Sequence, residues 1–223
     1  MIACFVTGTD TGVGKTLASA ALLHALARHH RRVVGMKPVA AGAVRMQDAW
    51  VNEDVLQLRA ASTIEVPPEL DNPVLLPDPL SPHIAAQRAG VRIDVGHLAA
   101  CFRELARRAD AVVVEGAGGF HVPLSQDATG AELAEALALP VILVVGLRLG
   151  CLSHAALTAE SIRARGLTLA GWVANRIDPA MDAPDDNIAW LRRRLDAPLL
   201  VDIPHQSRPD ARALTVELPP AWT

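Results

Sequence analysis

The chain has 223 residues, with 21 Lys and Arg against 24 Asp and Glu, which gives a formal net charge of -3 with His neutral. Apolar residues make up 51% of the chain and charged residues 20%, and this composition excludes a disordered protein. The charge balance argues against a protein that binds nucleic acid through bulk charge. Aromatic residues are only 3%, with no Tyr, so a stacking platform for single-stranded nucleic acid is not expected either.

The cysteines and the apolar runs indicate the compartment. Cys4, Cys101 and Cys151 are far apart and form neither a CxxC pair nor a zinc spacing, so we expect buried free thiols in a reducing environment. No apolar run reaches the ~20 residues of a membrane span. The N-terminus has no basic segment before a long apolar core, as a signal peptide would have. We therefore expect a cytoplasmic protein with no membrane partner.

Short apolar runs alternate along the chain with longer segments of helical period. Strands are predicted at residues 2–7, 33–37, 111–115, 141–146, 168–175 and 199–203, and helices at 15–29, 53–61, 95–108, 131–139, 154–165 and 186–195. Runs rich in Val and Ile with little alternation are typical of strands buried on both faces. This order predicts one α/β domain over residues 1–223, with a mostly parallel β-sheet flanked by helices on both faces.

Two segments stand outside this alternation. Residues 66–82 are too rich in proline for a regular helix and too apolar for a free linker, so we expect an ordered insertion packed on the domain edge. Residues 207–223 are polar and then rich in proline, and they are expected to form a C-terminal surface arm.

Residues 8–16, GTDTGVGKT, lie between the first predicted strand and the first predicted helix, the context that a P-loop requires. Gly8, Gly12 and Gly14 would let backbone amides turn toward one phosphate site at the start of the helix. Lys15 is expected to reach the β- and γ-phosphates of a nucleotide, and Thr16 to ligate Mg²⁺. Gly8 stands one position earlier than in the GxxxxGK[ST] pattern, so the loop is a variant of a P-loop.

Charged side chains follow two other predicted strands. Glu115 ends an apolar strand and precedes Gly-Ala-Gly-Gly, so its carboxylate is expected at the phosphate crevice, where it could hold Mg²⁺. Lys37 ends the second strand, where a lysine is costly unless it meets an anion. Asp54 lies near the start of the following helix. Each residue has an alternative interpretation. Glu115 could be a surface acid at a strand end, Lys37 a solvated lysine and Asp54 a simple charge at a helix start.

Motifs in chain order resemble those of the dethiobiotin synthetase family, from the first predicted strand to about Pro204. They are VTGTDT (6–11), VGKT (13–16), KPVA (37–40), SPH (81–83), VEGAGG (114–119), PLS (123–125), PVILVVG (140–146), LGC (149–151) and GWVAN (171–175). The resemblance implies a P-loop NTPase fold and a homodimer. It also implies ATP-dependent, Mg²⁺-dependent closure of a ureido ring from 7,8-diaminononanoate and CO₂ or bicarbonate, in biotin synthesis.

The resemblance also implies roles for individual residues. The catalytic residues would be Lys37, Lys15 and Thr11, and the metal ligands Thr16, Asp54 and Glu115. ATP would be bound by Gly12, Val13, Gly14, Lys15, Thr16, Asp54, Glu115, Gly116, Gly118, Asn175, Pro204 and His205. The diamine would be bound by Thr11, Lys37, Ala41, Pro82, Gly118, Leu147, Gly150, Cys151 and Ser153. In the family, the segment around Gly150 reaches the site of the partner subunit.

Three positions depart from the family pattern. Ala41 stands where members commonly carry a serine near the carbamate, so that hydroxyl contact is missing. Gly12 replaces an acid, and Ser153 replaces an amide side chain, each found in some members. Ser153 is also expected to be the N-cap of the helix that follows it.

A P-loop nucleotide switch remains the alternative. Residues 175–178, NRID, resemble the guanine-reading NKxD pattern of GTPases, but Pro179 follows directly. At the end of the middle strand, VEGAG (114–118) has Glu where a DxxG switch motif would have Asp. Partition ATPases carry an extra lysine early in the loop, where this chain has Asp10. An amidotransferase-type synthetase would need a further glutamine-hydrolysing domain, for which the chain has no room.

Overall fold

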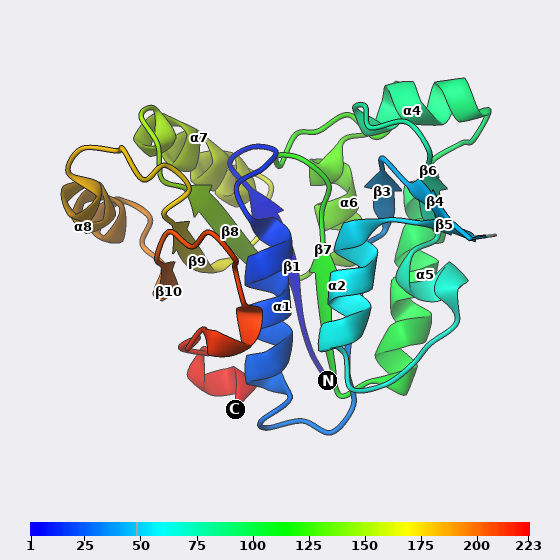
Figure 1. The fold of residues 1–223 in the computed structure, drawn as a ribbon, viewed down its shortest axis with the longest axis horizontal. Helices are drawn as coiled ribbons and strands as arrows, with labels where there is room; N and C mark the ends of the chain where they lie inside the picture. Colours follow the sequence, from blue (N-terminus) through cyan, green and yellow to red (C-terminus); the bar gives the residue numbers. More distant parts are fainter. Residues whose placement is uncertain (48) are drawn as a thin grey trace.

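A computed structural model of the protein describes residues 1–47 and 49–223. Six strands form one sheet in the order β10-β9-β8-β1-β7-β2, and every neighbouring pair is parallel (Figure 1). The strands are β1 (Ile2–Gly8), β2 (Val33–Met36), β7 (Ala111–Glu115), β8 (Val141–Gly146), β9 (Leu169–Asn175) and β10 (Leu199–Ile203). Their C-terminal ends therefore meet at one edge of the sheet, where ligands bind in open α/β folds.

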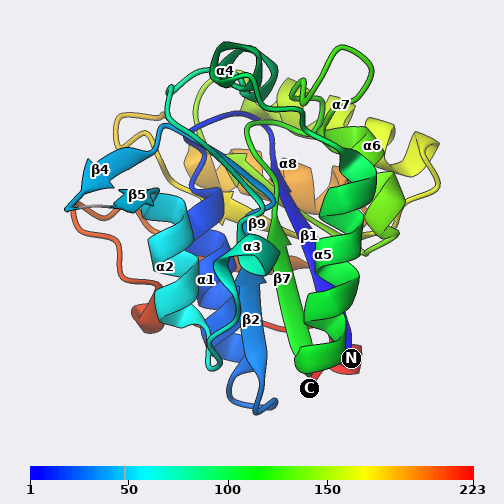
Figure 2. The same cartoon turned by 90° about the vertical axis from the view of Figure 1, so that its right-hand side faces the viewer.

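Helices cover both faces of this sheet, as predicted (Figure 2). On one face lie α1 (Lys15–Leu26) and α2 (Glu53–Ala61), and on the other α5 (Val95–Arg108), α6 (Gly130–Leu137), α7 (Cys151–Ala164) and α8 (Pro184–Arg194). Successive side chains of β1 point to opposite faces, so Phe5 joins one apolar cluster while Cys4 and Val6 join the other. Burial on both faces explains why the strand sequences are continuously apolar.

Some helix boundaries differ from those predicted. The first helix ends at Leu26 and does not reach residue 29. Helix α7 begins at Cys151 because Gly150 adopts φ 95, a left-handed conformation that suits glycine, and serves as the N-cap. Ser153 therefore lies inside the first turn, and its predicted role as the N-cap is wrong.

The proline-rich segment 66–82 contains regular structure too short for its sequence pattern to reveal. One helical turn, α3 (Pro68–Asp71), begins with a proline at its first position, which tolerates the missing N–H. The prediction that this segment contains no regular helix is therefore wrong for residues 68–71. The strand β6 (Val74–Leu76) then pairs in parallel with β3 (Val39–Ala41), outside the main sheet. Helix α4 (Pro82–Ala89) follows.

Backbone N–H groups along the outer edge of β2 donate hydrogen bonds to residues outside the sheet. The N–H of Val33 donates to Thr63 Oγ1 at 2.7 Å, and the N–H of Gly35 donates to Ser62 Oγ at 2.9 Å. The N–H of Lys37, directly after the strand, donates to the carbonyl of Asp71 at 2.7 Å. These bonds protect an edge that would otherwise be open to pairing with another strand.

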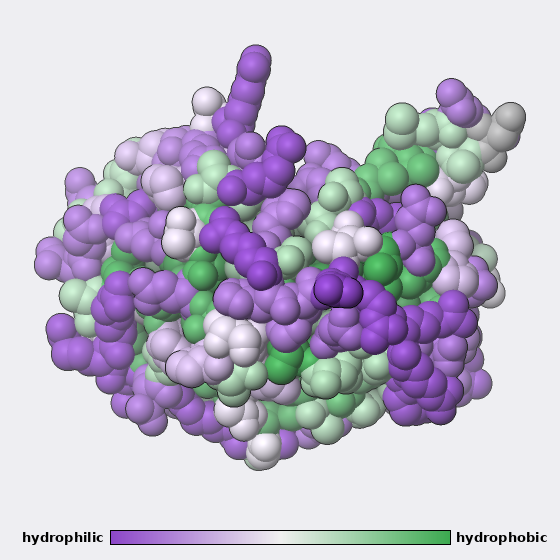
Figure 3. Space-filling model, turned by 90° about the horizontal axis from the view of Figure 1, so that it is seen from below, coloured by the Kyte–Doolittle hydropathy of each residue, from purple (hydrophilic) through white to green (hydrophobic). Residues whose placement is uncertain are grey.

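A short antiparallel hairpin, β4 (Val44–Met46) and β5 (Ala49–Val51), projects from the body of the protein. In Figure 3 it forms the protrusion at the upper right, with apolar surface beside it. Val44, Met46 and Trp50 are each more than half exposed there.

The C-terminal residues return to the P-loop helix. They contain the 3₁₀ turns η1 (Ala211–Ala213) and η2 (Pro220–Trp222), and Leu214 and Trp222 join the apolar cluster of α1. The carbonyl of Trp222 is 2.9 Å from His30 Nε2, just beyond α1. Of the helices in the described part of the chain, none has the length and apolar character to cross a membrane.

Candidate active site

A cavity of about 800 Å³ opens at the C-terminal edge of the sheet, between the loop after β1, the end of β2, the end of β7 and the proline-rich segment. Eleven of the predicted site residues line it: Thr11, Gly12, Gly14, Lys15, Thr16, Lys37, Ala41, Asp54, Pro82, Glu115 and Gly118. Residues that follow the ends of β1, β2 and β7 thus converge with the first residues of α1, α2 and α4 on a single space.

The loop after β1 owes its shape to glycines at two positions. Gly14 has φ 87 and is the N-cap of α1, and Gly12 has φ 73, so both adopt the left-handed conformation that glycine tolerates best. Gly8 has no positive φ but is needed for packing, because a Cβ there would lie 2.6 Å from Val13 Cγ2. The loop leads into the N-terminus of α1, which favours bound anions.

Lys15 lies along this loop and is buried. Its Nζ donates to the carbonyl of Asp10 at 3.0 Å. Burial, followed by repulsion from the charge of Lys37, lowers the pKa of Lys15 to about 8. Asp10 is fixed in turn, because its carboxylate accepts the N–H of Thr11 at 2.7 Å and forms an ion pair with Arg148. The loop therefore holds a partly desolvated cation that an incoming phosphate would neutralise.

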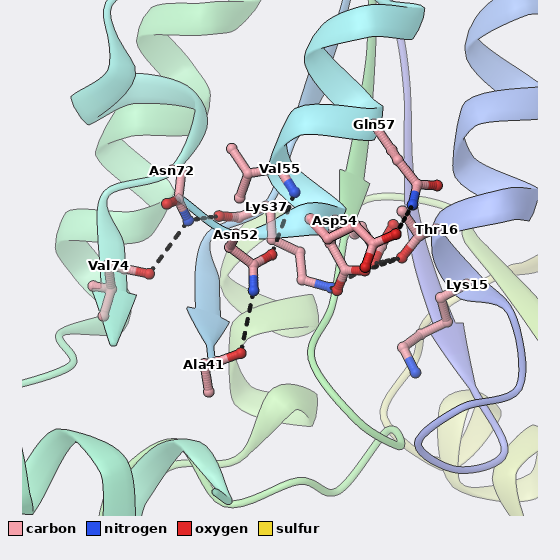
Figure 4. A network of polar contacts seen from close by, with 12 residues as sticks. Lys15, Thr16, Lys37, Ala41, Asn52, Asp54, Val55, Gln57, Asn72 and Val74 are labelled. Atoms are coloured by element: carbon pink, nitrogen blue, oxygen red, sulfur yellow. Dashed lines mark hydrogen bonds and ion pairs between the residues drawn. The ribbon is translucent and has the colours of Figure 1, made fainter. Parts of the chain in front are cut away.

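Four polar side chains meet at the floor of the cavity (Figure 4). Lys37 Nζ donates to Asp54 Oδ2 at 2.8 Å and to Glu115 Oε1. The hydroxyl of Thr16 lies 2.8 Å from Asp54 Oδ1 and 2.9 Å from Glu115 Oε1. The cluster joins the first residues of α1 and α2 to the ends of β2 and β7.

Burial and charge set the ionisation of this cluster. The side chain of Lys37 is 5% exposed and that of Glu115 0%. Burial alone would lower the pKa of Lys37, but the charges of Glu115 and Asp54 raise it further than burial lowers it. Burial would likewise raise the pKa of Asp54, but the charge and hydrogen bond of Lys37 and the hydroxyl of Thr16 lower it below its usual value. Lys37 and Asp54 therefore form a charged pair.

The oxygen atoms of this cluster fit a hard divalent cation. Glu115 Oε2 is buried and has no hydrogen-bond partner among residues 1–47 and 49–223, so a buried carboxylate oxygen is available for a ligand. Two carboxylates and a hydroxyl are the donor types that Mg²⁺ prefers. No group of three His, Cys, Asp or Glu side chains in the described residues could hold a metal by itself. A cation here would also need oxygens from a nucleotide.

Asn175 ends β9 and lies against the P-loop without lining the cavity. Its Nδ2 donates to the carbonyl of Val13 at 2.9 Å. Gly116, directly after β7, also lies outside the cavity lining, and its N–H donates to the carbonyl of Val6 at 2.9 Å. A Cβ at Gly116 would lie 2.9 Å from Phe5 Cζ, so this position needs glycine for close packing.

Pro204 and His205, the two residues after β10, do not line the main cavity. Pro204 lines a second cavity beside the C-terminal arm, and His205 Nδ1 lies 3.2 Å from the carbonyl of Arg176. Arg176 itself is paired with Asp202 at 2.7 Å and Asp185 at 2.6 Å. It therefore does not offer the free cation of a guanine-reading NKxD motif.

The remaining predicted diamine-binding residues cluster at the junction of β8 and α7. Leu147, Gly150, Cys151 and Ser153 belong to this junction, and none of them lines the main cavity of their own chain. Leu149, between them, is 97% exposed. The structure therefore does not bring this group together with Lys37 and Lys15.

Sequence reasoning missed several cavity residues. They are Val39, Pro79, Leu80, Ser81, Ala117 and Val122. Pro79 and Leu80 belong to the proline-rich segment, whose apolar character was the one available signal. Two buried asparagines were also missed (Figure 4). Asn52 donates to the carbonyl of Ala41, and Asn72 donates to the carbonyl of Lys37. A single asparagine in a sequence carries no periodic signal of burial.

Comparisons with known proteins agree with this geometry. Residues 3–212 match the family described as AAA domain. The chain is 56% identical over 218 residues to an ATP-dependent dethiobiotin synthetase of Aromatoleum aromaticum, covering 97% of this chain and 96% of that protein. It is 59% identical over 209 residues to an ATP-dependent dethiobiotin synthetase of Ralstonia nicotianae, covering 94% of this chain and 91% of that protein.

Solved structures of lower identity share the fold. The cell division protein FtsY of Thermotoga maritima matches with a TM-score of 0.55 at 18% identity, covering 99% of this chain and 66% of FtsY. The septum site-determining protein MinD of Pyrococcus horikoshii, complexed with Mg-ADP, matches with a TM-score of 0.55 at 21% identity, covering 92% of this chain and 81% of MinD.

The relatives of high identity show the family of this chain, whereas the solved structures of low identity show only its fold. At this low identity, the likeness to FtsY and MinD confirms the P-loop NTPase fold and nothing further. The nucleotide-switch alternative is not favoured, because both high-identity relatives are synthetases. The chain belongs to the ATP-dependent dethiobiotin synthetase family, as its motifs predicted.

Proposed function

We propose that this protein closes the ureido ring of dethiobiotin in the cavity at the end of the sheet, using ATP, CO₂ and 7,8-diaminononanoate. The observation that carries the proposal is the convergence of Lys15, Thr16, Lys37, Asp54 and Glu115 on one cavity. Two cations, two carboxylates and a P-loop suit phosphoryl transfer, which depends on positioning and charge neutralisation more than on covalent help from the protein.

The reaction proceeds in three steps. One amine of the substrate attacks CO₂ and loses a proton, which gives a carbamate. A carbamate oxygen then attacks the γ-phosphorus of ATP and expels ADP, which gives a carbamic-phosphoric anhydride. The second amine attacks the carbonyl carbon of the anhydride and loses its proton while phosphate leaves, and the ring closes.

Lys15, Lys37 and Thr11 are the proposed catalytic residues. Lys15 and the amides of the P-loop, including those of Gly12, Val13 and Gly14, neutralise the triphosphate. Lys37, whose ammonium group contacts Asp54 and Glu115, stabilises the carbamate and the phosphoryl group in transfer. Thr11 contacts the reacting groups from the exposed part of the loop.

Mg²⁺ would be held by Thr16, Asp54 and Glu115. When bound, it neutralises charge on the phosphate oxygens. The unpartnered buried Oε2 of Glu115 supports this assignment, because a cation there would satisfy it.

The nucleotide base lies on the side of the P-loop that Asn175 contacts. Gly116, Gly118, Asn175, Pro204 and His205 are the residues proposed to complete the ATP site. Asn175 already touches the loop at Val13, which supports a place for it beside the bound nucleotide.

The diamine occupies the part of the cavity near Ala41, Pro82 and Gly118, and its carboxylate is held by the partner subunit of a homodimer. Leu147, Gly150, Cys151 and Ser153 are the proposed partner residues, because none of them lines the cavity of their own chain. The exposed side chains of Leu149 and, on α7, Leu157 supply apolar area for such an interface. We also propose that the enzyme works in the cytoplasm, where its buried free cysteines stay reduced.

The test follows labelled bicarbonate into an acid-stable product, with Mg²⁺ and ATP, in the presence and absence of 7,8-diaminononanoate. Diamine-dependent fixation of label with one ADP released per product supports the proposal. ADP release without fixation of label would refute it. Sedimentation velocity of the wild type and of Leu149→Glu tests the dimer, which the glutamate should dissociate.

A further inference from the structure

We propose that Asn72 is a positioning residue for Lys37: it fixes the lysine backbone where the chain leaves the main sheet, and so aims the ammonium group into the cavity. This inference rests on the proposed catalytic role of Lys37. Asn72 would thus give the proline-rich segment a part in the chemistry beyond the substrate contact predicted for Pro82.

The geometry starts at the two backbone groups of Lys37 (Figure 4). Its carbonyl accepts a hydrogen bond from Asn72 Nδ2 at 2.7 Å. Its N–H donates to the carbonyl of Asp71 at 2.7 Å. The last residue of α3 and the C-cap that follows it therefore hold both backbone groups of one residue. Asn72 Nδ2 also donates to the carbonyl of Val74 at 3.3 Å, so the amide joins the backbone of Lys37 to the first residue of β6.

Lys37 needs this support because no sheet holds it. Strand β2 ends at Met36 in the main sheet, and β3 begins at Val39 in a different pair of strands. Pro38, between them, has no N–H to donate. A buried carbonyl without a partner is costly, so the side chain of Asn72 stabilises a backbone that ladder bonds do not stabilise.

A second connection ties the same segment to the helix that carries Asp54. The carboxylate of Asp71 is 3% exposed and accepts two hydrogen bonds from Arg59, at 2.7 Å and 2.6 Å. Arg59 lies in the last turn of α2, and Asp54 lies in its first turn. Asp54 in turn accepts from Lys37 Nζ at 2.8 Å.

The contacts form a closed ring. It runs from the Lys37 backbone through Asp71, Arg59 and helix α2 to Asp54, and back to the Lys37 ammonium group. Asn72 fixes the carbonyl at the start of this ring. Its removal frees the backbone of Lys37 to turn relative to α2, and a misplacement of about 1 Å at a catalytic group can cost on the order of a hundredfold in rate.

The chain offers an unusually direct readout, because Lys15 and Lys37 are its only lysines. Protein labelled with ¹³C at lysine Cε gives two side-chain signals, which a Lys37→Arg variant assigns. The test variants are Asn72→Ala and Asn72→Asp, the second of similar size but with no amide donor. Ser62→Ala is the matched control, because it removes a side-chain hydrogen bond to the same strand at Gly35.

In both Asn72 variants we expect the Lys37 signal to shift or broaden while the Lys15 signal stays in place. We expect kcat to fall on the order of ten- to a hundredfold with KM for ATP unchanged within about twofold, because ATP binding rests on the P-loop. Ser62→Ala is expected to lower Tm and to leave both signals and kcat unchanged. If Asn72→Ala does not fold, Asn72→Asp carries the test.

The proposal is overturned if the Asn72 variants behave like Ser62→Ala, with lower Tm and an unchanged Lys37 signal. Failure of the assigned role of Lys37 has a different signature. If Lys37→Met keeps wild-type kcat, the catalytic role falls, whereas the lysine signal still decides whether Asn72 positions that side chain.

Discussion

The hydroxyl of Thr16 lies 2.9 Å from Oε1 of Glu115, although 99 positions of sequence separate the two residues. The same hydroxyl lies 2.8 Å from Oδ1 of Asp54. A hydroxyl has one hydrogen to donate, so it cannot satisfy both carboxylates at once. Two carboxylates therefore share one hydroxyl and one lysine, and this excess of oxygen acceptors is what the proposed Mg²⁺ site would require.

Glu115→Gln tests that arrangement. The amide keeps the size of the side chain but removes the charge, so we expect the Mg²⁺ concentration for half-maximal nucleotide binding to rise by about tenfold or more. The measurement is the Mg²⁺ dependence of fluorescent ADP binding. Glu53→Gln is the control, because Glu53 is exposed and contacts Gln57 on the same helix. Equal Mg²⁺ requirements in the two variants would exclude Glu115 as a ligand.

The two left-handed glycines of the loop should respond differently to alanine. A Cβ at Gly14 would lie 2.1 Å from Asn175 Nδ2, whereas a Cβ at Gly12 would meet nothing within 4 Å. Gly12→Ala bears only backbone strain, about 1–2 kcal/mol, and should lower Tm by a few degrees. Gly14→Ala adds a clash and should lower Tm further and abolish nucleotide binding.

A double variant separates strain from clash. Asn175→Ala removes the side chain that the new Cβ would meet, so Gly14→Ala combined with Asn175→Ala should recover part of the lost Tm. Thermal unfolding without nucleotide measures this recovery free of any role of Asn175 in binding. Additive losses in the double variant would show that the two side chains do not interact.

Ala41→Ser restores the hydroxyl that family members commonly carry. Ala41 lines the cavity, and its carbonyl accepts a hydrogen bond from Asn52 at 3.2 Å, so the new hydroxyl would stand on a fixed backbone. A typical hydrogen bond contributes about 0.5–1.5 kcal/mol net, and we therefore expect kcat/KM for the diamine to rise a few-fold. Ala41→Cys, of similar size but a poor donor, should give no gain. An unchanged kcat/KM in Ala41→Ser would mean that Thr11 or water already makes the contact.

Acid stability should depend on Glu132, whose Oε2 accepts hydrogen bonds from the N–H of Thr129 at 2.7 Å and from its hydroxyl at 2.6 Å. These bonds from Thr129 lower the pKa of Glu132 from 4.5 to about 2. The folded state therefore holds this proton less tightly than the unfolded state does. The stabilisation is complete above pH 4.5 and is lost as the pH falls toward 2.

Glu132→Gln should therefore lower Tm at neutral pH by a few degrees, and the difference from the wild type should shrink as the pH falls from 4.5 toward about 2. Glu135→Gln is the control, because Glu135 contacts Arg165, as Glu132 does, but takes no part in the cap of α6. A constant difference in Tm across this pH range would contradict the assignment.

The parts of the fold that sequence could predict are those with local signals. The strand ending in Glu115 and the loop ending in Lys15 and Thr16 have patterns contained in fewer than ten residues, and the structure places all three residues at one cavity. The parallel topology follows from alternating strands and helices. It brings Lys37 and Glu115 together without any pairwise signal between them.

The other parts of the fold and of the site depend on long-range contacts that no local sequence pattern indicates. Strands β3 and β6 have three residues each and are stable only because they pair with each other across more than thirty positions. Asn72 acts on a residue 35 positions away, and its role is visible only once both backbone groups of Lys37 are accounted for. The N-cap of α7 is Gly150 and not the predicted Ser153, because the left-handed backbone conformation of Gly150 determines where the helix begins.

The return of the C-terminal arm to α1 has a consequence for how the protein is made. Leu22 and Leu26 of the P-loop helix leave the ribosome long before Leu214 and Trp222, which share their apolar cluster. The packing of the nucleotide-binding helix is therefore completed only when the chain up to Trp222 has left the ribosome. A nascent or prematurely terminated chain would display that apolar surface to chaperones and proteases.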